Sequence, residues 1–255
     1  MRKWITFDLD GTLMQNPFGA FIFPEIIEKM LKLSKKPYDV YKALVNEHLV
    51  RMKTKQYVAA YDWDDIVATH LQEMNIDCEI DVEKLVKKHS EKPKVYLLEK
   101  GILNILQQLK RRGYSLAAVT NGYRKYQLPV MSALGLSPYF DKIITPERAG
   151  VAKPDEKIFA AVDKMGQICA HIGDRLDHDV HAANLYGIPS ILIYRNLPLR
   201  LQTVDPNERY YDLALQGLLR EKWCKEKGYT KDTPIPKDSI PTAIIYSISE
   251  LLDPF

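Results

Sequence analysis

The chain is poor in cysteine and has no long apolar run. Its three cysteines, Cys78, Cys169 and Cys224, lie far apart and form no C-x-x-C pair. This argues against a disulfide framework and a thiolate zinc site, and we expect a reducing, cytoplasmic location. No apolar run reaches the roughly 18–20 residues of a membrane span. Asp8 and Asp10 interrupt the apolar N-terminus too early for a signal peptide, so no membrane association is expected.

The chain also lacks a large excess of charge of either sign. The chain has 36 Lys and Arg against 33 Asp and Glu, a net charge of +3, which gives no reason to expect a nucleic-acid partner. With 255 residues, 46% hydrophobic and 27% charged, it has the composition of a globular protein of one to two domains. Nothing in the sequence decides the oligomeric state, and a homodimer stays open.

What is present is an alternation of short apolar strands with helical stretches. Predicted strands cover residues 4–9, 115–120, 142–145, 169–173, 189–194 and 242–246. Helical spacing covers residues 102–111, 126–134, 158–165 and 179–185. The pattern predicts an α/β fold with a Rossmann-like parallel sheet, whose ligand site lies at the carboxyl ends of the strands. Polar side chains stand at those ends: Asp8, Asp10, Thr120, Asn121 and Asp174.

The region between the first two long strands is different. Four helical stretches, with no convincing strand among them, cover residues 23–32, 37–52, 58–74 and 82–89. We therefore expect a smaller all-helical domain at residues 15–93, inserted into a core of residues 1–14 and 94–255. Residues 196–240 are an insertion within this core, with one helix near 208–227. We expect this insertion to pack on the surface of the core or on a sheet edge. A role in a dimer interface is the alternative.

The first motif is Asp8-x-Asp10-Gly11, at the end of a strand. Gly11 permits a turn that brings the two carboxylates together. Such a pair can hold Mg²⁺, or can act as nucleophile and proton donor. By itself it is equally typical of a turn with capping acids.

Three further motifs carry similar alternatives. Thr120-Asn121-Gly122 suits phosphate oxygens, but it also suits a plain strand-to-helix turn. Lys153, followed by Pro154 and Asp155, precedes a helix and taken alone would be a solvated lysine. Asp174, with Asp179 five residues later, repeats the pattern of an acid at a strand end, which an N-cap also explains.

Taken together and in order, these motifs are specific. They are FDLDGTL at residues 7–13, VTNG at 119–122, KPD at 153–155 and GD-x4-D at 173–179. The set resembles the haloacid dehalogenase-like superfamily, and the helical block lies where members of its phosphatase branch carry a cap, between the first and second motifs. The resemblance covers the α/β part of the chain.

The resemblance implies a role for each motif residue. Asp8 would attack a phosphoryl group to form an aspartyl-phosphate, and Asp10 would protonate the leaving oxygen and then activate water. Thr120 would donate a hydrogen bond to a phosphoryl oxygen, with Asn121 nearby. Lys153 would neutralise the charge shared by nucleophile and phosphoryl group.

A magnesium ion is implied as the cofactor. Its ligands would be the Asp8 carboxylate, the Asp10 main-chain carbonyl and the Asp174 carboxylate. Asp179 would orient Lys153 or a metal-bound water.

The implied reaction is hydrolysis of a small phosphate monoester. Asp10 favours it over dehalogenation, because a departing halide needs no proton. A phosphomutase or phosphotransferase uses the same first motif and stays open, as does an inert binding protein with the same fold.

Three groups of side chains have competing interpretations. His178 and His181 share a helix face and could hold a transition metal, although exposed helix histidines are the commoner explanation. Two aromatic groups either line a substrate entrance or pack the helical block onto the core. They are Phe18, Phe21 and Phe23 in the first group and Tyr57, Tyr61 and Trp63 in the second.

Overall fold

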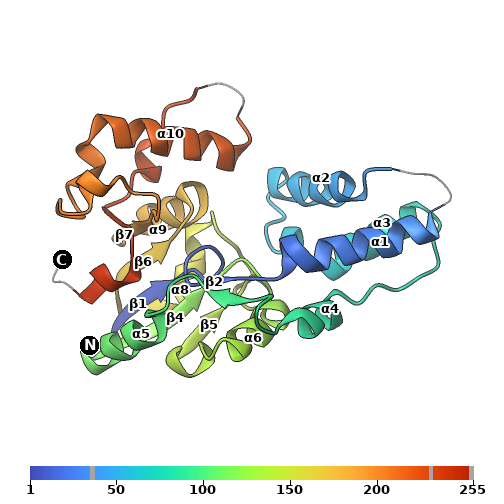
Figure 1. The fold of residues 1–255 in the computed structure, drawn as a ribbon, viewed down its shortest axis with the longest axis horizontal. Helices are drawn as coiled ribbons and strands as arrows, with labels where there is room; N and C mark the ends of the chain where they lie inside the picture. The colour runs from blue at the N-terminus through green and yellow to red at the C-terminus, as the bar shows by residue number, and fades with distance from the viewer. Residues whose placement is uncertain (35–37, 230–231, 253–255) are drawn as a thin grey trace.

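The computed structural model describes residues 1–34, 38–229 and 232–252, and its centre is a parallel six-stranded sheet (Figure 1). The strand order is β5-β4-β1-β6-β7-β8, with every neighbouring pair parallel. The strands are β1 (Lys3–Phe7), β4 (Tyr114–Val119), β5 (Lys142–Ile144), β6 (Gln167–Gly173), β7 (Ser190–Ile193) and β8 (Ala243–Ile245). All six correspond to predicted strands, and the predicted α/β class is confirmed.

Both faces of this sheet are covered, which is why its strands are mostly apolar. In β4, Leu116 and Ala118 join one core cluster, while Ala117 and Val119 join the cluster on the opposite face. On the first face lie α5 (Ile102–Arg111) and α6 (Arg124–Ala133). The second face is covered by short elements: η4 (Glu156–Phe159), α8 (Ala160–Asp163) and α9 (His181–Tyr186). The predicted helix at 158–165 therefore begins as a 3₁₀ turn.

A block of helices stands to one side of the sheet, on the right in Figure 1. It contains η1 (Phe18–Ile22), α1 (Phe23–Leu33), α2 (Val40–Lys53), η2 (Ala59–Tyr61), α3 (Trp63–Glu73) and α4 (Val82–His89). The predicted first residue of the second helix, Pro37, lies outside the described residues. The main-chain N–H of Lys42 donates to Asp39 Oδ1 at 2.9 Å, so Asp39 caps α2.

The chain enters and leaves this block through two paired segments. Strands β2 (Met14–Gln15) and β3 (Tyr96–Leu97) are antiparallel, with Met14 opposite Leu97. These strands were not predicted, because two-residue strands are too short to show an alternating pattern.

The insertion packs on the β8 side of the sheet. Its main helix, α10 (Leu213–Lys227), buries Leu215, Leu219 and Trp223 in a third core cluster with Leu176 and Leu192. It thereby covers η5 (Leu176–Val180), the segment that follows β6.

The remaining elements are short, namely η3 (Ser137–Tyr139), α7 (Pro146–Ala149), η6 (Leu199–Leu201), η7 (Arg209–Tyr211), η8 (Lys237–Ser239) and η9 (Ile248–Leu252). Over the described part of the chain, no helix has the length and apolar character needed to cross a membrane.

Candidate active site

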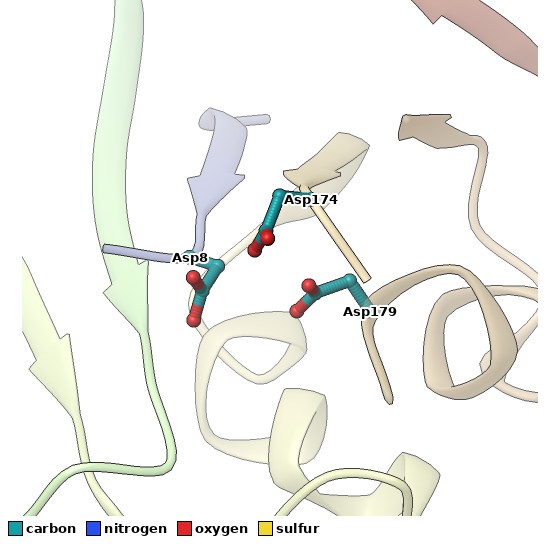
Figure 2. Close-up of side chains that lie close together, drawn as sticks. All are labelled: Asp8, Asp174 and Asp179. Carbon is teal, nitrogen blue, oxygen red and sulfur yellow. The ribbon is translucent and has the colours of Figure 1, made fainter. Parts of the chain in front are cut away.

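Three aspartates converge where β1 and β6 end (Figure 2). Asp8 follows β1, Asp174 follows β6, and Asp179 lies in η5, five residues further on. One carboxylate oxygen from each lies within 4.8 Å of the other two. The parallel sheet brings these residues together from distant parts of the sequence.

Lys153 lies at the centre of the site and is almost completely buried, with 2% of its surface exposed. Its Nζ donates to Asp8 Oδ1 at 2.8 Å, to Asp179 Oδ1 at 2.6 Å and to the carbonyl of Val119 at 2.8 Å. Burial alone would lower the pKa of Lys153, but Asp179 and Asp8 raise it well above its usual value. The lysine is therefore charged and fixed between two acids.

The site nevertheless carries excess negative charge. Burial raises the pKa of Asp8 well above its usual value against the opposing effect of Lys153, and the other aspartates add to the rise. Burial and the neighbouring Asp179 raise the pKa of Asp174 to about 6. A further cation would relieve this repulsion, and a donor set of oxygen atoms suits a hard cation such as Mg²⁺. The residues present thus fit the implied metal.

Both carboxylate oxygens of Asp179 form hydrogen bonds within the protein. Oδ1 accepts from Lys153 and interacts with His171 Nε2 at 3.2 Å, and Oδ2 accepts from the main-chain N–H of Arg175 at 3.0 Å. Burial would raise the pKa of Asp179, but Lys153 lowers it far below its usual value. A Cβ on Gly173 would lie 2.2 Å from Asp179 Cγ, so only glycine leaves room for this carboxylate. These contacts support the predicted orienting role.

Asp10 lies on the turn after Asp8 and makes different contacts. Its Oδ2 accepts from Gln127 Nε2 at 2.6 Å. Burial raises the pKa of Asp10, and the side-chain amides of Gln127 and Asn16 offset this only in part. The turn requires Gly11, whose φ is +81° and whose Cβ would lie 2.6 Å from Asp174 Oδ2.

Thr120 and Asn121, which follow β4, make different contacts. Thr120 Oγ1 accepts from the main-chain N–H of Gly122 and from Gln127, both at 3.2 Å, which leaves its own proton for an acceptor in the cavity. Asn121 exchanges two hydrogen bonds of 2.8 Å with the main chain of Lys153. Its side chain is therefore placed to hold Lys153, and direct contact with a phosphoryl oxygen stays a prediction.

A cavity of about 320 Å³ opens between these residues and the helical block. Its wall on the helical side is aromatic: Phe18, Phe23, His48, Tyr61 and Trp63. Phe21 instead stacks on His89, with ring centroids 5.7 Å apart. Part of the aromatic set thus lines the cavity, and part packs the helical block.

The two histidines do not form a metal pair. His178 lines the cavity, and burial lowers its pKa to about 3, so it is neutral. His181 Nδ1 instead contacts Ser239 Oγ at 3.2 Å. Both are partly buried, so the expectation of exposed histidines is wrong. Within residues 1–34, 38–229 and 232–252, neither belongs to a cluster of ligands suited to a metal.

Two groups that support the site have no signature in the sequence. Arg195 donates to the carbonyls of Gly11 and Thr12 at 2.8 and 2.7 Å and forms an ion pair with Glu99 at 2.8 Å. Glu226 of α10 accepts from the main-chain N–H of Leu176 at 2.9 Å, which joins the insertion to η5. No local motif marks either residue, because each acts on a segment distant in sequence.

We expect Arg195→Met to lower the free energy of unfolding by about 1–3 kcal/mol, because it leaves two carbonyls of the Asp10 turn and Glu99 without this donor. Thermal denaturation measures the loss. Arg220→Met on the exposed face of α10 is the control, since the ion pair that Arg220 makes within the described part of the chain is with exposed Asp232. Equal effects of the two changes would contradict a bracing role for Arg195.

Comparison with known proteins agrees with this geometry. The family model described as haloacid dehalogenase-like hydrolase matches residues 2–187. A glyceraldehyde 3-phosphate phosphatase of Methanocaldococcus jannaschii is 27% identical over 224 residues, which is 86% of this chain and 94% of that protein. The same-named protein of Methanopyrus kandleri is 33% identical over 109 residues, 41% of this chain and 46% of that protein.

Solved structures share the fold. An HAD phosphatase from Thermococcus onnurineus has a TM-score of 0.62 at 23% identity, covering 98% of this chain and 96% of that one. L-2-haloacid dehalogenase from Xanthobacter autotrophicus has a TM-score of 0.59 at 15% identity, covering 98% and 97%. The fold alone therefore does not select the leaving group. On the family match and the arrangement of its motifs, the chain belongs to the haloacid dehalogenase-like hydrolases.

Proposed function

We propose that this hydrolase cleaves a small phosphate monoester through an aspartyl-phosphate on Asp8, with Mg²⁺ as cofactor. The observation that carries the proposal is the contact of Lys153 with both Asp8 and Asp179, next to an Asp10 whose burial favours the protonated form. Relatives named phosphatases of glyceraldehyde 3-phosphate, phosphoglycolate and phosphoserine support it.

Asp8 is the nucleophile in this proposal. Its Oδ1 is held by Lys153 at 2.8 Å and its Oδ2 accepts from Thr12 Oγ1 at 3.2 Å, which fixes the carboxylate beside the cavity. Lys153 also offsets the repulsion between the carboxylate and an approaching phosphate anion. Attack forms a bond from an Asp8 oxygen to phosphorus as the bond to the leaving oxygen breaks.

Asp10 supplies the proton that the leaving oxygen needs. Its raised pKa keeps the carboxyl protonated to higher pH than an exposed aspartate would be. Once deprotonated, it can take a proton from the water that hydrolyses the aspartyl-phosphate. A halide would leave without this proton, so a buried acid at this place favours the phosphate ester over the haloacid.

Asp8 and Asp174, with the main-chain carbonyl of Asp10, would hold the magnesium ion. When bound, the ion would neutralise phosphate charge. Asp179 is assigned to Lys153 because its Oδ1 contacts that lysine at 2.6 Å and its Oδ2 accepts from the main-chain N–H of Arg175.

The helical block at residues 15–93 would act as the cap domain over a core of residues 1–14 and 94–255. Its aromatic wall faces the acidic site across the cavity, so the block contributes the surface that the alcohol part of the substrate meets. Transfer of the phosphoryl group to a second alcohol would use the same core residues.

The test is release of inorganic phosphate from a panel of phosphate monoesters, with and without Mg²⁺. We expect magnesium-dependent release that is absent from Asp8→Asn. Appearance of a new phosphate ester in place of inorganic phosphate would favour a transferase. Absence of both products from a folded sample would contradict the proposal.

We expect Asp174→Ala to raise the Mg²⁺ concentration for half-maximal activity by at least about tenfold, because one of two ligand carboxylates is removed. A magnesium titration of phosphate release measures this. Asp77→Ala, which removes an exposed carboxylate of the helical block, is the control. A titration curve equal to that of the wild type would remove Asp174 from the metal site.

A further inference from the structure

Gln127 is a buried amide that no motif of the sequence analysis marks. It lies on α6, seven residues after Thr120, and only 4% of its surface is exposed. Its Nε2 donates to Asp10 Oδ2 at 2.6 Å and to Thr120 Oγ1 at 3.2 Å. Both hydrogens of the amide are thus directed at residues of the proposed reaction.

The two oxygens of Asp10 are consequently not equivalent. Oδ2 is an acceptor from Gln127, whereas Oδ1 is shielded from solvent and accepts no hydrogen bond of normal geometry from a described residue. Asp10 lines the cavity. Gln127 therefore fixes the orientation of the Asp10 carboxyl group at the cavity.

Gly122 provides the space for this arrangement. A Cβ at that position would lie 2.1 Å from Gln127 Nε2, closer than any real contact. The Asn121-Gly122 turn therefore does more than reverse the chain. The absence of a side chain at Gly122 lets the Gln127 amide reach Asp10 and Thr120.

We propose that Gln127 is a positioning residue that holds the Asp10 carboxyl group in the orientation in which it gives its proton to the leaving oxygen. This inference rests on the proposed function. In the step concerned, the Asp8 carboxylate bonds to phosphorus, the bond from phosphorus to the ester oxygen breaks, and that oxygen takes the proton from the Asp10 carboxyl group. The products are the alcohol, the aspartyl-phosphate and an Asp10 carboxylate.

The test compares leaving groups in Gln127→Met, which keeps the size of the side chain and removes its donors. An alkoxide needs the proton, whereas a nitrophenolate leaves without it. We expect kcat/KM to fall about 10- to 100-fold for an alkyl phosphate and less than about threefold for nitrophenyl phosphate. kcat/KM is the appropriate constant because it includes only the steps up to departure of the leaving group. Later hydrolysis of the aspartyl-phosphate on Asp8 does not affect it.

Two further variants control the experiment. Met131→Leu changes a buried side chain of the same helix without touching Asp10, and we expect both substrates to react as in the wild type. Gly122→Ala displaces the amide sterically and should reproduce the selective loss. Equal losses for both esters in Gln127→Met, or no loss, would overturn the positioning role. Activity that survives in Asp8→Asn would instead contradict the proposed function itself.

Discussion

Replacing Asp8 by asparagine is expected to lower kcat by at least about a thousandfold, because the amide cannot attack phosphorus. The fold should persist. The asparagine side chain would keep an oxygen for Lys153, and loss of a buried carboxylate whose pKa is already raised removes charge from a crowded acidic site. Phosphate release and thermal denaturation, measured on the same preparation, test the two halves of this expectation.

Asp77→Asn is the matched control, since it makes the same chemical change at an exposed position of the helical block. It should retain wild-type turnover. Substantial activity in a clean preparation of Asp8→Asn would exclude Asp8 as nucleophile. Loss of activity together with loss of the folded state would point to a structural role.

Lys153→Met is expected to impair both stability and turnover. The change leaves Asp8 and Asp179 facing each other without the buried cation that contacts both, next to Asp174. Breaking such a buried pair costs about 3–5 kcal/mol, and we expect that loss in the free energy of unfolding without Mg²⁺. Turnover should fall by at least about a hundredfold, because the phosphate anion would meet an uncompensated carboxylate.

The double variant Lys153→Met with Asp179→Asn separates charge from packing. Removing the negative charge of Asp179 should recover part of the stability lost in Lys153→Met, and a double-mutant cycle would measure this recovery. Turnover should not recover, since Lys153 is still missing from Asp8. Additive losses of stability in the double variant would contradict the charge balance assigned to this pair.

The sheet was predictable because its strands are buried on both faces. A continuous apolar run ended by a polar residue, as at residues 116–119 of β4, identifies both the strand and its carboxyl end. The two-residue strands β2 and β3 gave no such signal. Their pairing depends on the chain returning to the same place after about 80 residues, which local sequence does not encode.

The acidic part of the site was predictable for a related reason. Asp8, Asp174 and Lys153 stand at strand or loop ends that a parallel sheet brings to one edge. The residues that brace them were not predictable. Arg195, Glu226 and Gln127 act through contacts with distant segments, and an arginine, glutamate or glutamine in a surface-like context has no distinguishing pattern. Asn121 was recognised as a site residue, but its contacts with Lys153 became visible only in the structure.

The most direct test of the account is to trap the phosphorylated enzyme. Wild-type protein is quenched in acid during turnover with Mg²⁺ and a phosphate ester, and its peptides are analysed by mass spectrometry. The account predicts one phosphoryl group, labile to hydroxylamine, on the peptide that contains Asp8, and none in Asp8→Asn. A phosphoryl group on a different residue of the cavity, such as His48 or His178, would contradict it.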